Sequence, residues 1–315
     1  MIWLQWIDAG THLRPPTKVK EKMPELPEVE TVKRGLEPFL AGATIEKVIL
    51  NRPDLRFPFP DNMADRLIGQ TIIHVGRRAK YLVLGLSSHE VLLAHLGMSG
   101  SFKVGKYVPD AAARVHKQQL SIKHDHVVMQ LTHPTQGVVE LVYNDPRRFG
   151  YMDLIAQGAP NKHLDHLGPE PLSNQFNADH LAQRFANKKS PVKTGLLDQR
   201  NVAGLGNIYV CEALYEMGID PFKPMAQLAS DYGRDPAQLE GLTQAIKRTL
   251  QIAIAAGGST LKDFKNAQGD LGYFQHQFKV YGREGELCAN EGCGTSIERR
   301  VQSGRSTFMC PTCQT

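Results

Sequence analysis

The stretch Met23–Thr31 reads Met-Pro-Glu-Leu-Pro-Glu-Val-Glu-Thr and is the most informative segment of this 315-residue chain. Met23 could itself start translation, and its removal would leave Pro24 with a free secondary amine beside the carboxylate of Glu25. A chain-terminal amine titrates near about pH 8, so an appreciable fraction is uncharged and nucleophilic at neutral pH. The alternative interpretation is an ordinary proline-rich lead-in to a helix.

The segment before this stretch differs from the rest of the chain. It holds both tryptophans, Trp3 and Trp6, and the pair Pro15-Pro16. It lacks the basic start, the longer apolar stretch and the small-residue cleavage site of a signal peptide. We therefore expect residues 1–23 to be a leader outside the fold, either a mis-assigned start or a disordered extension. A short interaction peptide is the alternative.

Composition and charge narrow the class of protein. The length suggests two domains. A mean hydropathy of −0.32 and the lack of a long apolar run argue against a membrane span. The net charge of +5 and the pI near 8.9 suit a polyanionic partner. Lys and Arg are spread along the chain, so this charge does not belong to a basic tail.

The hydrophobic pattern changes along the chain. A helix is expected from Pro27, with Pro38 limiting its length, and many short strand-like runs follow, which is typical of a β-sandwich or barrel. After the proline hinge at 168–171 the pattern becomes helical. The predicted strands are Thr44–Leu50, Thr71–Val75, Tyr81–Leu86, Val91–Leu96, Ser121–Met129, Val138–Tyr143 and Tyr151–Ile155; the predicted helices are Ala178–Ala186, Ile208–Met217 and Gln238–Ala256.

Four of the five cysteines lie in the last 28 residues, in two closely spaced pairs. Four thiolates at these spacings indicate one structural Zn²⁺ that holds a small hairpin in a reducing cytosol. A turn is expected at Ser303-Gly304, and Arg305 directly after it could reach a phosphate; a solvated surface arginine is the alternative. The proposed ligands are Cys288, Cys293, Cys310 and Cys313.

Two glycine-bounded loops combine residues that suit nucleic acid. Arg147 and Phe149 lie on the tight loop 144–150, where arginine could contact phosphates or base edges and the ring could wedge between bases. Met98 lies on the loop 95–100, and its flexible side chain could fill the space that a displaced base leaves. The alternatives are a charged turn with a buried Phe and a core methionine.

Three further features are weaker when taken singly. The basic run 188–193 leads to a helix, and the Gly-Leu-Gly of 204–206 opens another, where free amides could bind phosphate. Lys80 follows Arg77-Arg78-Ala79 at the start of a strand and is the cation we place near the chemistry. The alternative for the Gly-Leu-Gly segment is a plain turn, and the alternative for Lys80 is a solvated strand edge.

Taken together, these motifs resemble the formamidopyrimidine-DNA glycosylases, bacterial base-excision enzymes for oxidised purines. The match runs in order over 24–314. The resemblance implies an α+β protein with two domains, a β-sandwich with flanking helices and then a helix–two-turn–helix domain that carries a four-cysteine zinc hairpin. The motifs are MPELPEVET, RRAKY, HLGMSGS, KHDHV, DPRRFG, HLGPEPL, GLGNIY, TLKDF, GYF, VYGR and the cysteine module.

The same resemblance implies domain limits and a partner. The expected catalytic domain covers 24–168, the DNA-binding helical domain 169–282 and the zinc hairpin 283–315. The partner would be double-stranded DNA with oxidised purines, bound by a monomer in the bacterial cytoplasm at the nucleoid. No membrane association is expected.

The resemblance also implies roles for individual residues. Pro24 would attack C1′ of the damaged nucleotide, Glu25 would be the acid at the sugar and Glu28 would support it. Lys80 would assist β-elimination and Arg305 δ-elimination. The loop 262–273 would close over the extruded base. The expected DNA contacts are His124, Arg147, Lys188, Lys193 and Asn207, with Met98 and Phe149 filling the gap in the duplex.

Two features leave alternatives open. Four residues separate Cys288 from Cys293 where relatives more often have two, although spacings of two to four suit zinc. An endonuclease VIII-like enzyme for oxidised pyrimidines would share the proline chemistry. If the leader is retained, Pro24 is a tertiary amide, and the chain would be a catalytically silent DNA-binding protein.

Overall fold

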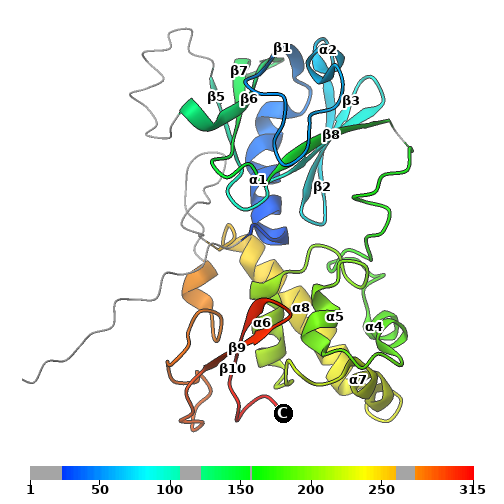
Figure 1. The fold of residues 1–315 in the computed structure, drawn as a ribbon, viewed down its shortest axis with the longest axis vertical. Coiled ribbons are helices and arrows are strands. Elements are labelled where there is room, and N and C mark those ends of the chain that lie inside the picture. The colour runs from blue at the N-terminus through cyan, green and yellow to red at the C-terminus, as the bar shows by residue number, and fades with distance from the viewer. Residues whose placement is uncertain (1–22, 107–121, 157, 260–273) are drawn as a thin grey trace, which may run out of the picture.

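The computed structural model describes residues 23–106, 122–156, 158–259 and 274–315. The β-strands of the first half lie at one end of the molecule and the helices of the second half at the other, with helix α1 between them (Figure 1). No helix among the described residues is long and apolar enough to cross a membrane. The leader 1–22 and the loop 262–273 lie outside the described residues.

Helix α1 (Leu26–Leu40) begins at a reciprocal cap. The side chain of Glu25 accepts from the backbone three residues on, and the side chain of Glu28 accepts from the Glu25 amide. Its apolar face is buried against the sandwich and the helical half. The prediction that Pro38 limits the helix is slightly wrong, because the helix continues to Leu40. A proline in the last turn removes one hydrogen bond without displacing the residues that follow.

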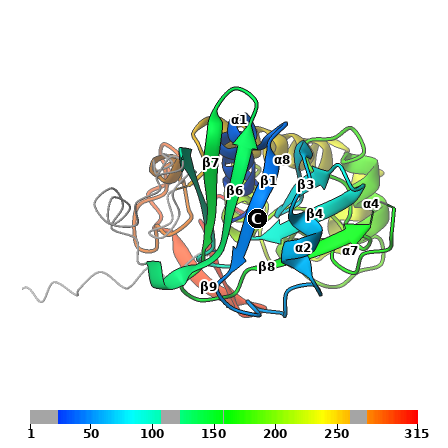
Figure 2. The same ribbon diagram turned by 90° about the horizontal axis from the view of Figure 1, so that it is seen from above.

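Two four-stranded antiparallel sheets form the β-sandwich, with strand orders β1-β6-β7-β5 and β2-β3-β4-β8. Figure 2 looks down on them, with β1, β6 and β7 in one group and β3, β4 and β8 in the other. The sheets bury rows of aliphatic side chains and Tyr143 between them. The strands are β1 (Thr44–Leu50), β2 (Ile72–Arg78), β3 (Tyr81–Leu86), β4 (Glu90–His95), β5 (Ser101–Lys106), β6 (Asp125–His133), β7 (Gly137–Asn144) and β8 (Tyr151–Ala156).

The predicted strands agree with these bounds to within a few residues, with two differences. The strand expected at Ser121–Met129 begins later, because Ile122–His124 forms a 3-10 turn before β6. Strand β5 and the five-residue helix α2 (Met63–Leu67) were not predicted. Both are short, and β5 is held by its pairing with β7.

The helical half packs around α6 (Asn207–Glu216), which is buried along almost its whole length. Helix α8 (Ala237–Ala255) lies against it and also reaches α1. Three other helices complete this half: α4 (Ala178–Phe185), α5 (Val192–Leu197) and α7 (Met225–Tyr232). The sequence predicted α4, α6 and α8, expected a helix after the basic run 188–193, where α5 lies, and did not predict α7.

A two-stranded hairpin closes the chain. Strands β9 (Glu298–Gln302) and β10 (Arg305–Met309) are joined by the predicted Ser303-Gly304 turn, in which both residues have positive φ. The hairpin packs on α6 through a small apolar cluster. The 3-10 turn η2 (Phe274–Gln277) precedes it. A core this small leaves most of the hairpin's stability to its cysteines.

Candidate active site

The N-terminal end of α1 inserts into the helical half. Glu25 is buried, and its Oε1 accepts a hydrogen bond of 3.1 Å from the amide of Ile208 at the start of α6. The amide of Leu26 donates to the carbonyl of Gly204 at 3.3 Å. A Cβ at Gly206 would lie 2.0 Å from Glu25 Cδ, so only glycine allows this approach. The Gly-Leu-Gly motif therefore seats the carboxylate that follows Pro24, itself a buried residue.

Glu28 is fully buried and surrounded by donors. Its Oε1 accepts from the Tyr209 hydroxyl at 2.6 Å, and from the Ser259 amide at 2.9 Å and hydroxyl at 2.8 Å. Burial, followed by the charges of Glu28 and Glu25, raises the pKa of Tyr209, so its hydroxyl stays protonated and can donate. These bonds fix the carboxylate that caps Glu25, which fits the supporting role expected for Glu28.

Lys80 is buried at the turn between β2 and β3, so the alternative of a solvated strand edge is wrong. It follows Ala79, whose φ of 52° is unusual for a residue other than glycine. Burial lowers the pKa of Lys80 most; the charge of Glu25 raises it, that of Arg305 lowers it and that of Glu28 raises it. The charges of Glu25, Arg305 and Glu28 therefore all shift the pKa of Lys80, as expected if these predicted catalytic residues lie at one junction.

Two residues that we expected to contact phosphates, Lys193 and Asn207, form hydrogen bonds with the hairpin. Lys193 is almost completely buried, and its Nζ donates to the Ser306 carbonyl at 3.0 Å and to Thr307 Oγ1 at 2.7 Å. Asn207 Nδ2 also donates to the Ser306 carbonyl, at 2.9 Å. Lys193 is the more deeply buried of the two because α5 turns this residue of the basic run inward, and its phosphate contact stays a prediction. Both side chains hold the backbone next to the exposed Arg305.

The loop 144–150 is fixed from inside by a residue that the sequence analysis did not single out. Asp145 is fully buried and accepts from Ser99 Oγ at 2.5 Å, from the Gly150 amide at 2.9 Å and from the Arg147 amide at 3.3 Å. The sequence shows only an Asp-Pro step in a loop that ends in Gly, which marks a turn but not the partners of the carboxylate. Asp145 joins this loop to the loop that carries Met98.

Close packing of the two loops brings their predicted residues together. A Cβ at Gly97 would lie 2.4 Å from the Gly150 amide, so the backbones are in contact. The Arg147 guanidinium lies 4.8 Å from the centre of the Phe149 ring. That ring is 43% exposed, so it is accessible to a partner. Met98 is half-buried and lies between Gly97 and Ser99, the two residues that contact the loop 144–150.

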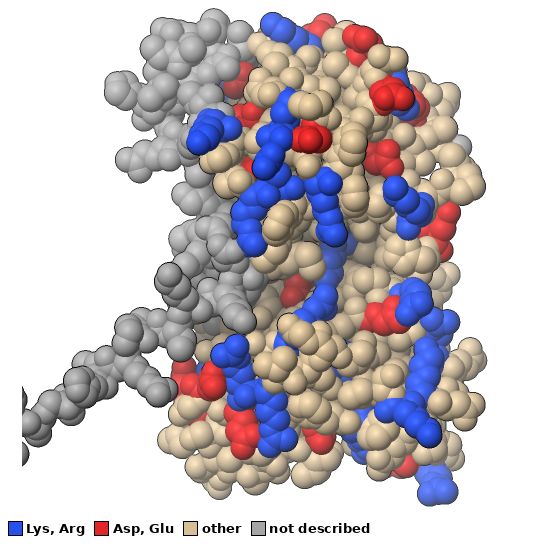
Figure 3. Space-filling view, viewed as in Figure 1, with Lys and Arg blue, Asp and Glu red and all other residues tan. Residues whose placement is uncertain are grey.

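The remaining predicted DNA contacts border the same junction. His124 is half-buried, and its carbonyl accepts from the Asp145 amide at 3.0 Å, which places it beside the loop 144–150. Lys188 is half-exposed between α4 and α5. Lys and Arg side chains border the hollow between the two halves on the face that Figure 3 shows. A polyanion is the partner that such a face attracts.

The four predicted zinc ligands form one cluster, with all four sulfur atoms within 4.8 Å of one another. Individual Sγ–Sγ distances are 3.8 Å for Cys288–Cys313, 3.6 Å for Cys293–Cys310 and 3.4 Å for Cys293–Cys313. Tetrahedral Zn–S bonds of about 2.3 Å require sulfur separations of about 3.8 Å. The donor set fits one structural zinc ion, and the longer first spacing does not prevent it.

Three family models match the chain in succession. They describe the formamidopyrimidine-DNA glycosylase N-terminal domain (residues 23–152), the formamidopyrimidine-DNA glycosylase H2TH domain (167–265) and a zinc finger found in FPG and IleRS (285–315). Together these matches cover both halves and the hairpin.

Individual relatives agree with the family models. Formamidopyrimidine-DNA glycosylases of Rhizobium leguminosarum bv. trifolii and Rhizobium meliloti are 51% and 52% identical, over 93% of this chain and their own full lengths. The crystal structure of the MutM (Fpg) protein from Thermus thermophilus matches with a TM-score of 0.76 at 36% identity, covering 92% of this chain and 98% of its own. Lactococcus lactis Fpg bound to DNA with an abasic site matches with 0.77 at 32%, covering 93% and 100%.

Proposed function

Because this chain belongs to the formamidopyrimidine-DNA glycosylase family, we propose that it excises oxidised purines, 8-oxoguanine and formamidopyrimidines, and then cleaves the strand. It is a DNA glycosylase of base excision repair that carries one structural zinc site. The substrate class and the residue roles are the proposal. The observation that carries it is that Glu25, directly after Pro24, and Lys80 are both buried at the junction, where burial lowers the pKa of Lys80 and the charge of Glu25 raises it.

In the proposed reaction the Pro24 nitrogen attacks C1′ of the extruded nucleotide. The glycosidic bond breaks with its electron pair going to the base, and Glu25 supplies a proton at the sugar as its ring opens. The product is an iminium ion between Pro24 and C1′. Loss of the C2′ proton expels the 3′ phosphate, and a second elimination expels the 5′ phosphate. Hydrolysis of the iminium then frees the enzyme.

The choice of proline has a chemical reason. A secondary amine that condenses with an aldehyde carbon has no N–H left to lose, so its imine remains cationic. That cation acidifies the C2′ proton and drives strand cleavage, whereas a lysine imine can become neutral. The Pro24 nitrogen must therefore be free, which requires a chain that begins at Pro24 after removal of Met23.

Lys80 and Arg305 assist the two eliminations. Burial lowers the pKa of Lys80, so a larger fraction of its amine is neutral and can accept a proton during β-elimination. Arg305, exposed at the hairpin tip, stays charged and can stabilise the departing phosphate in δ-elimination. Lys193 and Asn207 contribute by holding the backbone beside Arg305.

The duplex would be held along the basic hollow. Phe149 and Met98 would fill the space left by the extruded nucleotide, with Arg147 against the opposite base. His124 and Lys188 would contact phosphates. We further propose that a monomer suffices to clamp one duplex at the nucleoid, with its functional domains at 24–168, 169–282 and 283–315.

Borohydride trapping tests this function directly. The chain is incubated with a duplex carrying 8-oxoguanine opposite cytosine, reduced, digested, and the crosslinked peptide is identified by mass. A crosslink on an N-terminal Pro24 supports the proposal. A matched duplex with an oxidised pyrimidine is the control; a faster reaction with it would favour an endonuclease VIII-like enzyme. DNA binding without any crosslink would make the chain, as translated, a silent binding protein.

A further inference from the structure

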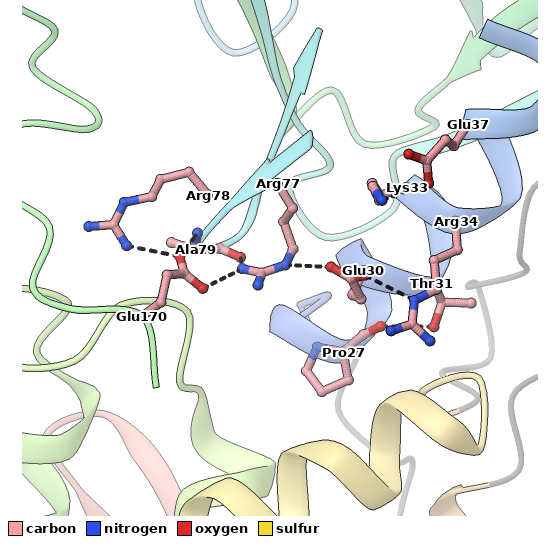
Figure 4. Close-up of polar contacts among 10 residues, drawn as sticks. All are labelled: Pro27, Glu30, Thr31, Lys33, Arg34, Glu37, Arg77, Arg78, Ala79 and Glu170. Atoms are coloured by element: carbon pink, nitrogen blue, oxygen red, sulfur yellow. Dashed lines mark hydrogen bonds and ion pairs between the residues drawn. The ribbon is translucent and has the colours of Figure 1, made fainter. Parts of the chain in front are cut away.

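A carboxylate where the chain passes between its halves contacts the turn that carries Lys80 (Figure 4). Glu170 Oε1 accepts from the Ala79 amide at 2.6 Å and from Arg78 Nη1 at 2.8 Å, and its Oε2 accepts from Arg77 Nη1 at 2.8 Å. Both oxygens are therefore used, and all three donors come from consecutive residues. Lys80 directly follows these three residues in the sequence.

The backbone that Glu170 binds has an unfavourable conformation at Ala79. Ala79 has a φ of 52°, in the left-handed region that residues other than glycine rarely adopt. Such conformations persist only where surrounding contacts fix them. The bond from the Ala79 amide to Glu170 is a contact of this kind, and it acts one residue before the buried lysine.

The same arginines extend the network in both directions. Arg78 Nη2 donates to the carbonyls of Leu167 and Gly168, at 3.1 and 2.6 Å. Arg77 Nε donates to Glu30 Oε2 on α1 at 3.0 Å, and Figure 4 shows Arg77 lying between the two carboxylates. The interdomain linker, the Lys80 turn and the helix that begins at Glu25 are therefore joined by one set of bonds.

We propose that Glu170 is a positioning residue for Lys80: by fixing the Ala79 backbone and the two arginines, it sets where the lysine lies at the junction of the two halves. This inference rests on the proposed role of Lys80 in elimination. Glu170 acts through geometry, because the charges that influence Lys80 most are those of Glu25, Arg305 and Glu28.

A double-mutant cycle separates positioning from general stabilisation. Single-turnover strand cleavage is measured on a duplex with a preformed abasic site, using the wild-type protein, Glu170→Ala, Lys80→Ala and the double variant. We expect Glu170→Ala to slow cleavage roughly 10- to 100-fold, the scale of misplacing a catalytic group by about 1 Å. In the Lys80→Ala background the same change should cost less than about twofold, because the group being positioned is already absent.

Two further variants guard the interpretation. Glu216→Ala removes a carboxylate that bonds Arg248 Nε at 3.0 Å on the exposed surface of α6 and α8, and should leave cleavage unchanged. Glu170→Gln keeps the size of the side chain and one acceptor for the Ala79 amide, so it should recover part of the lost rate. It also allows the measurement if Glu170→Ala does not fold, which thermal unfolding would reveal.

The outcomes are distinct. An equal loss from Glu170→Ala with and without Lys80, or no loss with Lys80 present, would overturn the positioning role. In either case the wild-type protein would still be trapped by borohydride, so the proposed function would stand. If Lys80→Ala cleaved at the wild-type rate, the elimination role of Lys80 would fail and the positioning role with it.

Discussion

The N-terminal end of α1 and the zinc hairpin both carry side chains that we propose to be catalytic, but different forces hold them. Glu25 and Glu28 are buried in the interior and fixed by hydrogen bonds from α6 and from the end of α8. Arg305 stands exposed on a two-stranded hairpin with a small apolar cluster beneath it. A large core can orient a carboxylate without metal, whereas the hairpin depends on four thiolates and a few polar contacts.

The largest expected effect comes from changing the nucleophilic amine while leaving both regions folded. Pro24→Gly replaces the secondary amine with a primary one whose imine can become neutral. We expect base excision to fall by roughly 10²–10⁴-fold, the scale of losing an activated catalytic group. Binding to a duplex with an abasic-site analogue should change far less. Equal losses in excision and in binding, measured by single-turnover kinetics and fluorescence anisotropy, would contradict the nucleophile assignment.

Breaking the hairpin alone tests the other side of the comparison. Cys310→Ser removes one of four ligands, so zinc should be lost and the hairpin should unfold, because it has too little core of its own. DNA affinity should fall together with the zinc content measured by atomic absorption. The β-sandwich should keep its thermal unfolding transition. Full zinc and full affinity in this variant would show that the cysteines do not hold the hairpin.

Acid should weaken the β-sandwich through a histidine. Burial, with help from Lys80, Arg56 and His163, lowers the pKa of His95 to about 4 from 6.5. Between those values the unfolded chain binds more protons than the folded one, so stability falls as the pH drops from 6.5 towards 4. The loss across this window is about 3 kcal/mol.

Calorimetry of the wild-type protein and of His95→Gln over this pH range checks the prediction. The neutral amide of glutamine does not titrate, so the variant should show a shallower decline in stability. Identical slopes for the two proteins would assign the acid sensitivity to other groups.

The smallest expected effect loosens one loop of the sandwich. Asp145→Asn keeps the shape of the side chain but replaces one acceptor oxygen with a donor, which opposes the donors Ser99, Arg147 and Gly150. We expect a loss of about 1–3 kcal/mol in unfolding free energy. DNA binding should weaken as well, because the loop carries Phe149. Thr243→Ala, which removes a hydroxyl that donates to the Glu240 carbonyl at 2.7 Å within α8, provides the loss of one polar contact elsewhere. A similar loss of binding in that variant would show that the effect is not specific to the loop.

Long, regular elements and the zinc site were predictable because their signals are local. Strands β1 and β3 have the predicted bounds, since alternation or a continuous apolar run marks a strand directly. The cysteine spacings identified the four ligands for the same reason. Helix α7 was missed, and the bounds of α5 were not predicted, because helices of eight and six residues owe their stability mainly to tertiary packing.

The same distinction between local sequence signals and tertiary packing applies to the site residues. The sequence identified Glu25 and Lys80 through motifs, but their burial and mutual influence depend on segments more than fifty residues apart. The burial of Lys193 against the hairpin could not be predicted, because nearby lysines look alike in sequence and only packing distinguishes them. Asp145 and Glu170 were not singled out, since a single acidic residue carries no signal of its partners.

The sequence by itself determined the family, the order of the matched domains and the four clustered cysteines, and it predicted Pro24 as the nucleophile with Glu25 as its neighbouring acid. These depend on residue types at fixed spacings along one chain. Tertiary structure alone decided which cations face the hollow, which hold the hairpin, and how a linker carboxylate grips the turn before Lys80. These side-chain placements depend on contacts between segments that are distant in the sequence. The energies of such contacts are set by burial and distance, and neither can be read from the local order of residues.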